Sequence, residues 1–293
     1  MKTLDGKVVV ITGAGSGIGR ALALNAAAKG AILALTDVDE VGLLETLEHA
    51  RTQTNREIRT DKLDVRDRDE IASYAASVRQ KFGRVNVLIN NAGVALHGDF
   101  AETSYAQFEW VMDINFWGVV NGTKEFLPHL IESGDGHVVN ISSLFGLMGM
   151  PGQSAYNSSK FAVRGFTEAL RLEMLIAKHP VEVSCVHPGG IKTAIARNAR
   201  TTKSQDAASI AELFDKKLAK TSADKAAQVI IDGVLAGKPR IVVGMDAKFL
   251  DKWLRLVGPR YQGVVARIAH RIMPKPIEQT AAEAREQAVP VRR

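Results

Sequence analysis

The 293 residues are enough for one large domain or two small ones, and 46% hydrophobic with 24% charged residues is ordinary for a globular protein with a full core. The net charge of +6 is confined to the tail: residues 248–293 hold 10 Lys/Arg and 4 Asp/Glu, which leaves 28 of each kind for residues 1–247. A neutral main body without a nucleic-acid-binding motif argues against a nucleic-acid partner.

The cysteine and hydropathy patterns predict a cytoplasmic protein. Cys185 is the single cysteine, so an internal disulfide is impossible, C-x-x-C pairs are absent, and we expect no bound metal. No apolar run approaches the ~18 residues of a membrane span. The apolar run at residues 8–11 is too short for the core of a signal peptide.

Strand-like and helix-like segments alternate along the chain, which is typical of βαβ units. Strands are predicted at residues 7–12, 31–36, 58–63, 85–89, 136–141, 181–186 and 240–243. Helices are predicted at residues 20–29, 40–51, 68–82, 105–131, 155–178 and 223–235. The pattern predicts an α/β fold with a doubly wound (Rossmann), mostly parallel seven-stranded sheet and helices on both faces.

A glycine-rich segment lies between the first strand and the first helix. Gly13, Gly17 and Gly19 give the spacing G-x-x-x-G-x-G rather than G-x-G-x-x-G. Glycines here let the backbone approach a pyrophosphate, and the N–H groups at the start of the next helix favour an anion. The position of the segment therefore predicts dinucleotide binding rather than a loop without a ligand.

Two acidic residues end the next two strands. Asp37 lies 18 positions after Gly19, where a carboxylate suits the ribose hydroxyls of NAD and repels a 2′-phosphate. Val38 follows, so no basic side chain comes next to receive that phosphate. We therefore predict NAD as the cofactor. Asp64 either accepts a hydrogen bond from the adenine amino group or serves as a turn residue, and the sequence leaves both open.

Tyr156 and Lys160 are four residues apart and share one helical face, but this pair alone is a weak signal. Several other motifs accompany it in a fixed order, and with them the chain resembles the short-chain dehydrogenase/reductase family in its single-domain, NAD-preferring form. The motifs that carry the resemblance are Thr12-Gly13-x-x-x-Gly17-Ile18-Gly19, Asn90-Asn91-Ala92-Gly93, Ser143, Tyr156-x-x-x-Lys160 and Pro188-Gly189.

The resemblance implies a catalytic set of Asn115, Ser143, Tyr156 and Lys160. In this set Tyr156 is the general acid/base of hydride transfer, and Ser143 donates a hydrogen bond to the substrate oxygen. Lys160 favours the phenolate and binds the nicotinamide ribose; moving a tyrosine pKa from about 10 to about 7 requires roughly 4 kcal/mol. Asn115 bends its helix and holds a water linked to Lys160. Ser142 is expected to bond only to backbone.

The resemblance also implies which residues bind NAD. Ile191 and Thr193 hold the nicotinamide carboxamide, whereas Lys192 is expected to be solvated. The full set is Gly13, Ser16, Gly17, Ile18, Gly19, Asp37, Asp64, Val65, Asn91, Ala92, Gly93, Tyr156, Lys160, Pro188, Gly189, Ile191 and Thr193.

Substrate contacts are expected from residues 94–97, 144–153 and 194–221. The middle loop is apolar, with methionines that adapt to irregular ligands, and it predicts a hydrophobic secondary alcohol or ketone as substrate. Packing of this loop on its own protein or on a partner subunit remains open. For His97 a contact with the substrate and an exposed loop position are both considered, and the exposed loop histidine is favoured.

The predicted division is a dinucleotide-binding and catalytic domain at residues 1–246 and a basic amphipathic helical extension at 247–293. A mobile excursion is expected at about 194–221, with a short helix near 210–218. Residues 249, 250, 253, 254 and 257, and again 261, 264, 265, 268, 269 and 272, place apolar side chains at helical spacing.

Such helices can pack across the substrate cleft or onto another subunit, and we favour this interpretation. The alternative is peripheral membrane contact through residues 248–273. The end from about residue 274 is expected to be disordered. Resemblance to the family also implies a homodimer or homotetramer, through the helices at 105–131 and 155–178.

Three functions compete at this stage. The first is an NAD-dependent alcohol dehydrogenase or ketone reductase. The second is a non-catalytic NAD-binding sensor or scaffold, for which a broken Ser/Tyr/Lys set is expected. The third is a ketoreductase of acyl-carrier thioesters, which generally uses NADPH, so Asp37 argues against it.

Overall fold

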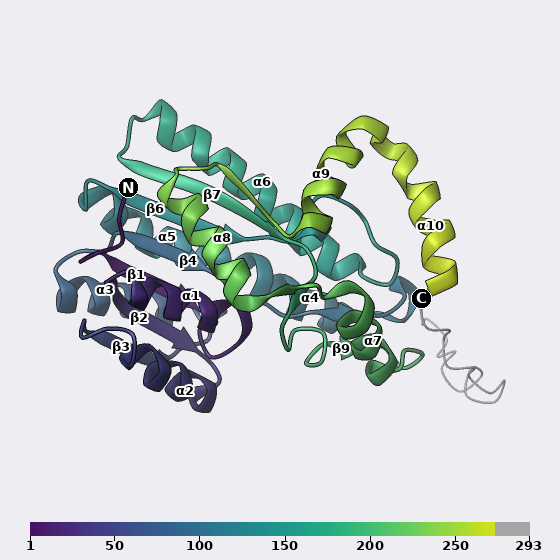
Figure 1. Cartoon of the computed structure of the whole chain (residues 1–293), viewed down its shortest axis with the longest axis horizontal. Helices are drawn as coiled ribbons and strands as arrows, with labels where there is room; N and C mark the ends of the chain where they lie inside the picture. Colours follow the sequence, from purple (N-terminus) through teal and green to yellow (C-terminus); the bar gives the residue numbers. More distant parts are fainter. Residues whose placement is uncertain (273–293) are drawn as a thin grey trace, which may run out of the picture.

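Seven strands form one sheet in residues 1–272, the part of the chain that the computed structural model describes (Figure 1). The order is β11-β7-β6-β4-β1-β2-β3, and every pairing is parallel, so the sheet has no antiparallel strand. The strands are β1 (Val8–Thr12), β2 (Ile32–Asp37), β3 (Ile58–Lys62), β4 (Val87–Asn90), β6 (Gly136–Ile141), β7 (Val181–Pro188) and β11 (Arg240–Val243).

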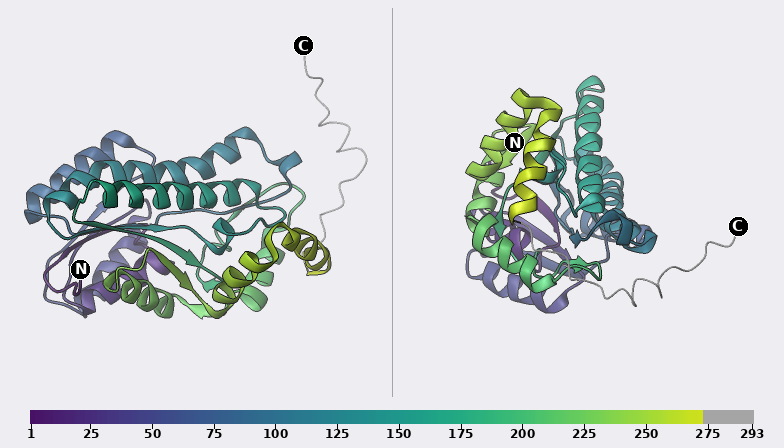
Figure 2. Two further views of the ribbon diagram at one scale, coloured as in Figure 1. Left: turned by 90° about the horizontal axis from the view of Figure 1, so that it is seen from above. Right: turned by 90° about the vertical axis from the view of Figure 1, so that its right-hand side faces the viewer.

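Helices cover both faces of the sheet, as the views in Figure 2 show. One face carries α1 (Gly17–Ala28), α2 (Glu40–Arg51) and α8 (Ala223–Leu235), and the other carries α3 (Arg68–Phe82), α5 (Gly118–Glu132) and α6 (Ser154–Ile176). Alternate residues of β1 enter the two cores: Val9 and Ile11 pack with Leu22, whereas Val8 and Val10 pack with Phe126. A strand buried on both sides must be apolar throughout, which explains its unbroken Val/Ile run.

The helix predicted at residues 105–131 is present, but it is not α-helical throughout. It divides into α4 (Tyr105–Met112), a π-helical turn at Asp113–Trp117, and α5. The turn is centred on Asn115, whose fully buried amide bonds to a neighbouring loop. Pro128 lies inside α5 without ending it.

Residues 194–221, predicted as an excursion with one short helix, contain a helix and short strands. Short strands β9 (Arg200–Thr201) and β10 (Thr221–Ser222) pair with β5 (Leu96–His97) and β8 (Ile191–Lys192), respectively. The predicted helix at 210–218 begins earlier, as α7 (Ala207–Leu213), and continues as a π-helical turn at Phe214–Leu218. The Arg200 guanidinium stacks 3.8 Å from the centre of the Trp110 ring, which ties the segment to α4.

The C-terminal extension is a helical hairpin, which we define as α9 (Met245–Val257) and α10 (Tyr261–Ile272) joined by a 3-10 turn at Gly258–Arg260. Both predicted helices are present. Their apolar stripes divide: Leu250 and Leu254 pack against the body, whereas Phe249 is 68% exposed. The disorder predicted from residue 274 lies outside the described residues. No helix within residues 1–272 is long and apolar enough to cross a membrane.

The strand order places the predicted motifs at one edge of the sheet. β1 lies between β2 and β4, so the chain turns one way from β1 toward β3 and the other way toward β11. Loops that follow strands on either side of such a reversal open a crevice at the carboxyl ends of the strands. The glycine segment follows β1 and Asn91 follows β4, so both lie at this crevice.

Candidate active site

The glycine segment leaves the start of α1 open to a ligand. Ser16 is the N-cap residue, but its exposed side chain makes no capping hydrogen bond to the first turn. Thr193 approaches from the loop after β7: a Cβ built on Gly17 would lie 3.3 Å from the Thr193 side chain. Uncapped N–H groups at the positive end of a 12-residue helix, next to a threonine, fit the pyrophosphate of a dinucleotide. Ile18, partly buried, packs beneath this end.

Close packing explains why glycines are needed at two of these positions. Gly13 has a positive φ of 66°, and a Cβ there would lie 2.7 Å from the Ala92 Cα. A Cβ on Gly19 would lie 2.0 Å from the Gly13 carbonyl oxygen and 2.5 Å from the Asn91 Nδ2. The β1 and β4 loops are thus in backbone contact.

Thr12 and Asn91 hold these two loops together. The Thr12 hydroxyl accepts hydrogen bonds from the backbone N–H groups of Asn91 (3.0 Å) and Ala92 (3.1 Å). The Asn91 amide donates to the carbonyls of Thr12 (2.9 Å) and Gly13 (3.0 Å). Four hydrogen bonds therefore fix the floor of the crevice, which explains why the sequence carries threonine and asparagine at these strand ends.

Asp37 points back at the glycine segment. Its carboxylate accepts hydrogen bonds from the N–H groups of Gly15 (2.8 Å) and Asp39 (3.0 Å). The nearby Arg20 donates to the Gly15 and Gly42 carbonyls and to Glu45, so its guanidinium is committed to protein groups. A carboxylate with no free arginine beside it fits a ribose with unmodified hydroxyls better than a 2′-phosphate.

In the β3–α3 loop Asp64 is paired with Arg66, so it has a structural role in the turn, and its contact with adenine stays a prediction. The Asp64 carboxylate accepts from the Arg66 N–H at 3.0 Å and from the Arg66 guanidinium at 2.6–3.0 Å. These bonds to Arg66 lower the pKa of Asp64. Val65 is buried, and its carbonyl accepts a hydrogen bond from Asn121. The loop is therefore firmly placed, but the Asp64 carboxylate is already engaged by a neighbour.

Tyr156 and Lys160 lie one turn apart on α6 with both side chains buried. The Lys160 Nζ is 5.7 Å from the centre of the Tyr156 ring and donates to the Ile141 carbonyl at 3.1 Å. Ser143, at the end of β6, accepts from the Phe145 N–H at 3.1 Å and is also buried. The structure thus brings the phenol, the ammonium and the hydroxyl to one place.

Burial changes the acid–base properties of this pair. It raises the pKa of Tyr156, and the Ser143 hydroxyl opposes this only in part. Burial also lowers the pKa of Lys160 to about 8. In the protein without a cofactor, loss of solvation is the larger effect on the Tyr156 phenol. The predicted shift of its pKa toward neutrality belongs to the complex with NAD, in which the positive nicotinamide acts together with Lys160, and it stays a prediction.

Asn115 connects the β4 loop to α6. Its side-chain oxygen accepts from the Val94 N–H at 2.8 Å, and its NH2 group donates to the Val94 carbonyl (3.0 Å) and to the Ser159 hydroxyl (3.1 Å). A Cβ on Gly93 would lie 3.1 Å from the Asn115 side-chain oxygen and 3.4 Å from the Lys160 Nζ. The π-helical turn is centred on Asn115, the position at which the helix is expected to bend. Ser142 bonds to the Lys160 carbonyl at 2.8 Å, as expected of a structural serine.

The loop after β7 closes the crevice. Pro188 ends β7, the Gly189 N–H donates to the Val243 carbonyl at 2.9 Å, and Ile191 is buried. Asp246, a residue that the sequence did not mark, accepts from the Gly190 N–H at 2.9 Å. Lys192 is exposed, as predicted.

Two further residues near the site have no sequence signal. His187 bonds through Nδ1 to the Ser143 carbonyl at 3.0 Å; because a carbonyl only accepts, Nδ1 carries the proton. Burial lowers the pKa of His187 to about 4, so the ring is neutral at physiological pH. Asn157, next to Tyr156, bonds to three backbone groups of the loop that contains Phe145. Their partners are distant in sequence or lie in an irregular loop, so no spacing rule could find them.

His97 differs from its prediction. It is partly buried in β5 rather than exposed, and the Gln153 amide lies 3.0 Å from its Nδ1. Burial lowers the pKa of His97 to about 4, so it carries no charge at neutral pH. Two of the predicted substrate loops, 94–97 and 144–153, are therefore in contact with each other.

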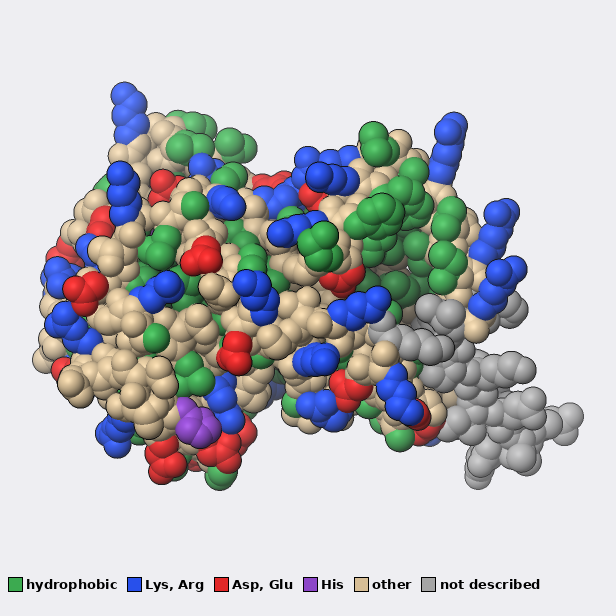
Figure 3. Space-filling model, viewed as in Figure 1, with side chains coloured by type: hydrophobic (Ala, Val, Ile, Leu, Met, Phe, Trp, Pro, Cys, Tyr) green, Lys and Arg blue, Asp and Glu red, His purple; other side chains and the backbone are tan. Residues whose placement is uncertain are grey.

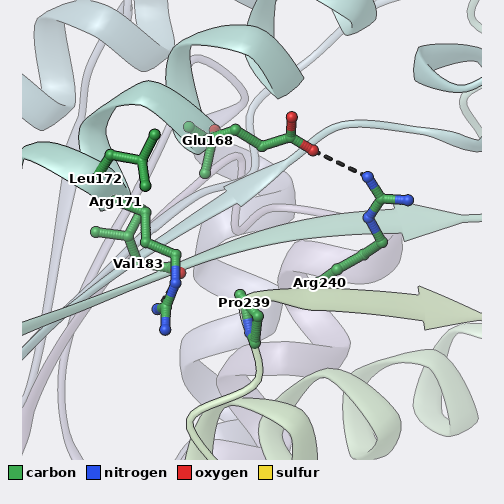
Figure 4. Close-up of a pocket in the computed structure, with 7 residues that line it drawn as sticks. Glu168, Arg171, Leu172, Val183, Pro239 and Arg240 are labelled. Atoms are coloured by element: carbon green, nitrogen blue, oxygen red, sulfur yellow. Dashed lines mark hydrogen bonds and ion pairs between the residues drawn. The ribbon is translucent and has the colours of Figure 1, made fainter. Parts of the chain in front are cut away.

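A separate hollow lies at the edge of the sheet, lined by α6, β7 and β11 (Figure 4). Its arginines are paired: Arg240 with Glu168 at 2.9 Å and Arg171 with Glu182 at 3.3 Å. Pro239 precedes β11, so this hollow lies toward the amino ends of the strands, away from the crevice. Among residues 1–272 there is no group of three or more His, Cys, Asp or Glu that could hold a metal ion.

Comparison with known families gives one match that spans most of the main body. The family model of the short chain dehydrogenases matches residues 7–204, from the first strand through the glycine segment, Ser143, Tyr156 and Lys160 to the loop after β7. The SadH protein of Mycobacterium tuberculosis, whose name marks it as a candidate oxidoreductase, is 54% identical over 274 residues, which cover 94% of this chain and 99% of SadH. The similarity therefore includes α9 and α10.

More distant relatives share the same fold. Epidermal retinol dehydrogenase 2 of Mus musculus is 38% identical over 201 residues, which cover 68% of this chain and 65% of that protein. A crystal structure of a short-chain dehydrogenase/reductase from Burkholderia phymatum in complex with NAD superposes with a TM-score of 0.78. It is 29% identical and covers 96% of this chain and 100% of its own.

Proposed function

The chain belongs to the short-chain dehydrogenase/reductase family and is an oxidoreductase, and on that premise we propose that it is an NAD-dependent alcohol dehydrogenase or ketone reductase. The observation that carries the proposal is the buried group of Tyr156, Lys160 and Ser143 beside the crevice of the glycine segment. A non-catalytic NAD sensor would not need a buried phenol and ammonium on one helical face.

NAD is the cofactor. The open N-terminus of α1 and Thr193 suit its pyrophosphate, and Asp37 suits its adenine ribose. The neighbouring structure from Burkholderia phymatum contains NAD, which supports this assignment. When bound, NAD supplies the hydride acceptor or donor of the reaction. The set of binding residues is the one implied by the family motifs, from Gly13 to Thr193.

Tyr156 moves the proton. Its raised pKa keeps the phenol protonated at neutral pH, so in reduction it is ready to donate to the substrate oxygen. Ser143 donates a second hydrogen bond to that oxygen and stabilises its developing charge. Lys160 places its ammonium beside the ring and lowers the cost of the phenolate that forms. Asn115 fixes the loop next to Lys160 and holds the water linked to Lys160, through which the proton returns to Tyr156.

The substrate is a hydrophobic secondary alcohol or ketone. The loop beyond Ser143 is apolar, and Leu144 and Met148 are buried in a cluster that includes the first tail helix. The name of epidermal retinol dehydrogenase 2 also describes an apolar alcohol as substrate. An apolar wall next to Tyr156 favours such molecules over sugars and polyols, which would leave their hydroxyls without partners.

The replacement Tyr156→Phe tests the proposal. It removes the proton donor and keeps the ring, so kcat should fall by about 10²- to 10⁴-fold. The affinity for NADH, measured by the change in its fluorescence, should change by less than about twofold, since Tyr156 is outside the pyrophosphate and adenosine contacts. Retention of full turnover in this variant would refute the assignment of Tyr156.

Cofactor choice has its own test. Wild-type kcat/KM should be higher with NADH than with NADPH, because Asp37 repels a 2′-phosphate. A higher value with NADPH, together with turnover of acyl-carrier thioesters, would instead support the thioester ketoreductase.

The quaternary structure follows the family as a homodimer or homotetramer. Large apolar side chains are exposed on the outer faces of the π-helical turn and α6, as expected of a surface that packs on a second copy: Trp117, Phe161, Leu172, Leu175 and Ile176. Analytical ultracentrifugation that shows only a monomer at micromolar concentration would reject this.

For residues 248–273 the contacts favour packing on the body over peripheral membrane attachment, because Leu250, Leu254 and Val265 are already in contact with the main domain. Sedimentation with anionic liposomes, comparing the whole chain with one that ends at Ala247, distinguishes the two. Equal sedimentation of both chains is expected.

A further inference from the structure

The base of the α9–α10 hairpin is attached to the cofactor side of the crevice. Asp246, in the first turn of α9, accepts a hydrogen bond from the Gly190 N–H at 2.9 Å. Asp251 accepts from Arg240 of β11 at 3.1 Å and from Arg255 at 3.1 Å, with only 15% of its side chain exposed. The first helix of the hairpin is therefore held at two points by the sheet and by the loop after Pro188.

The apolar face of the hairpin lies on the loop that follows Ser143. Leu144, Met148 and Ala247 are buried in one cluster. The side chains packed against it come from the loop, from β11 and from both tail helices: Phe145, Leu147, Met150, Val242, Leu250, Leu254, Tyr261 and Val265. In Figure 3 the apolar side chains gather in a hollow between the two arms of the hairpin. The tail thus supplies one side of the apolar wall.

A single polar contact fastens the far helix to this loop. The Tyr261 hydroxyl, at the start of α10, accepts a hydrogen bond from the Gly149 N–H at 2.8 Å across 112 residues of sequence. The built Cβ of Gly149 would lie 3.5 Å from the same hydroxyl, an ordinary van der Waals distance. Tyr261 is a polar anchor within an otherwise apolar contact.

The same loop is fastened from the other side by the catalytic helix. Asn157 donates to the carbonyls of Phe145 (2.7 Å) and Met148 (2.7 Å) and accepts from the Met150 N–H (3.0 Å). The Phe145 ring meets the Tyr156 ring edge-on with centroids 6.3 Å apart. The loop therefore touches the catalytic phenol at one end and the tail at the other.

We propose that Tyr261 is a specificity-determining residue: by holding Gly149 it positions the loop and the hairpin as the outer wall of the substrate site, and this wall binds the apolar part of the substrate beyond the reacting carbon. The inference rests on the proposed reductase function. A small ketone contacts only Tyr156 and Ser143. A ketone with an aromatic ring reaches the wall, so only the second kind of substrate depends on Tyr261.

Two methyl ketones with the same reacting group test this, 4-phenyl-2-butanone and 2-butanone. In Tyr261→Phe the ring stays and the acceptor is lost, so KM for 4-phenyl-2-butanone should rise about three- to tenfold, the effect of one missing hydrogen bond. Its kcat should stay within about twofold, and both constants for 2-butanone should be unchanged. Tyr105→Phe is the matched control, since Tyr105 is 90% exposed and distant from Tyr261 in the sequence. This replacement should leave KM and kcat for both ketones unchanged.

A readout independent of turnover accompanies the kinetics. Calorimetric titration of the NADH-loaded protein with 4-phenyl-2-butanone should show the same three- to tenfold weaker binding in Tyr261→Phe. Equal changes for both ketones, a fall in kcat alone, or no change in KM and Kd would each overturn the inference. So would a wild-type protein that neither binds nor reduces the aromatic ketone but reduces 2-butanone. Reduction of both ketones by Tyr156→Phe overturns the proposed function instead, so the two failures are distinct.

Discussion

The two sides of the crevice are built by different means. On the cofactor side the β1 and β4 loops are in backbone contact, with a built Cβ on Gly13 only 2.7 Å from the Ala92 Cα. On the substrate side an irregular loop is held largely by side chains: the Asn157 amide, the Tyr261 hydroxyl, the contact of Gln153 with His97, and apolar contacts. Backbone contact permits almost no change of residue, whereas side-chain contacts can be exchanged one at a time.

The largest effect is expected on the cofactor side, from Gly19→Ala. The added methyl group would overlap the Gly13 carbonyl and the Asn91 amide, so the β1 loop must move. We expect a loss of about 4 kcal/mol or more in the free energy of unfolding, and an affinity for NADH at least about 100-fold weaker, by calorimetry. Normal NADH binding in this variant would show that the loop is not as closely packed as the structure indicates.

A smaller effect is expected on the substrate side, from Asn157→Ala. The change leaves the Phe145 and Met148 carbonyls and the Met150 N–H without their partner, at a cost of about 2–3 kcal/mol by urea unfolding. KM for an apolar ketone should rise and NADH affinity should not change. Asn25→Ala, which removes a single bond to the Ala21 carbonyl, serves as the control and should cost less than about 1.5 kcal/mol. Weakened NADH binding in Asn157→Ala would contradict the separation of the two sides.

Lys160 lies where the two sides meet, and its lowered pKa has a consequence for stability. Because its pKa falls from an ordinary 10.5 to about 8, the folded chain binds fewer protons than the unfolded chain between these pH values, so its contribution to stability rises with pH there. At pH 7 the buried ammonium costs roughly 3 kcal/mol.

Lys160→Met should therefore stabilise the cofactor-free protein at pH 7 by about 2 kcal/mol, after about 1 kcal/mol is lost with the bond to the Ile141 carbonyl. The gain should shrink as the pH rises from 8 to 10.5, while turnover is lost at every pH. Thermal unfolding at several pH values measures it; a gain that is constant over this range would show that the lysine is not titrating as described.

The smallest effect is expected from Gly165→Ala, the counterpart of Gly19→Ala. Gly165 also lies in a helix, but a Cβ there meets nothing within 4 Å. The replacement should add about 0.5–1 kcal/mol to the free energy of unfolding, as alanine favours a helix over glycine. If Gly165→Ala instead destabilises a chain that oligomerises, Gly165 lies at a contact between subunits and not at the crevice.

Prediction from sequence succeeded where the requirement is local. The periodicity of apolar residues predicted the seven strands and the layered fold. The glycine spacing and Asp37 predicted the cofactor side, because each of these signals lies within a single turn or at the end of a single strand. The π-helical turn was only partly foreseen: Asn115 marked the place, but its amide bonds to Val94 and Ser159 decide the geometry.

The burial that raises the pKa of Tyr156 in the cofactor-free protein has no signal in the sequence, because a sequence shows which charges are near but not how far a group is removed from water.

The sequence alone determined the fold, the crevice and the identity of the groups at its centre, since residues a few positions apart share a helical face or a strand end. Only the tertiary structure decided how the substrate side is enclosed. Gly149 and Tyr261 are joined across 112 residues, and Asp246 meets Gly190 across 56. No periodicity connects such positions; they meet because the sheet brings its carboxyl ends together and the tail returns over the loop that follows Ser143.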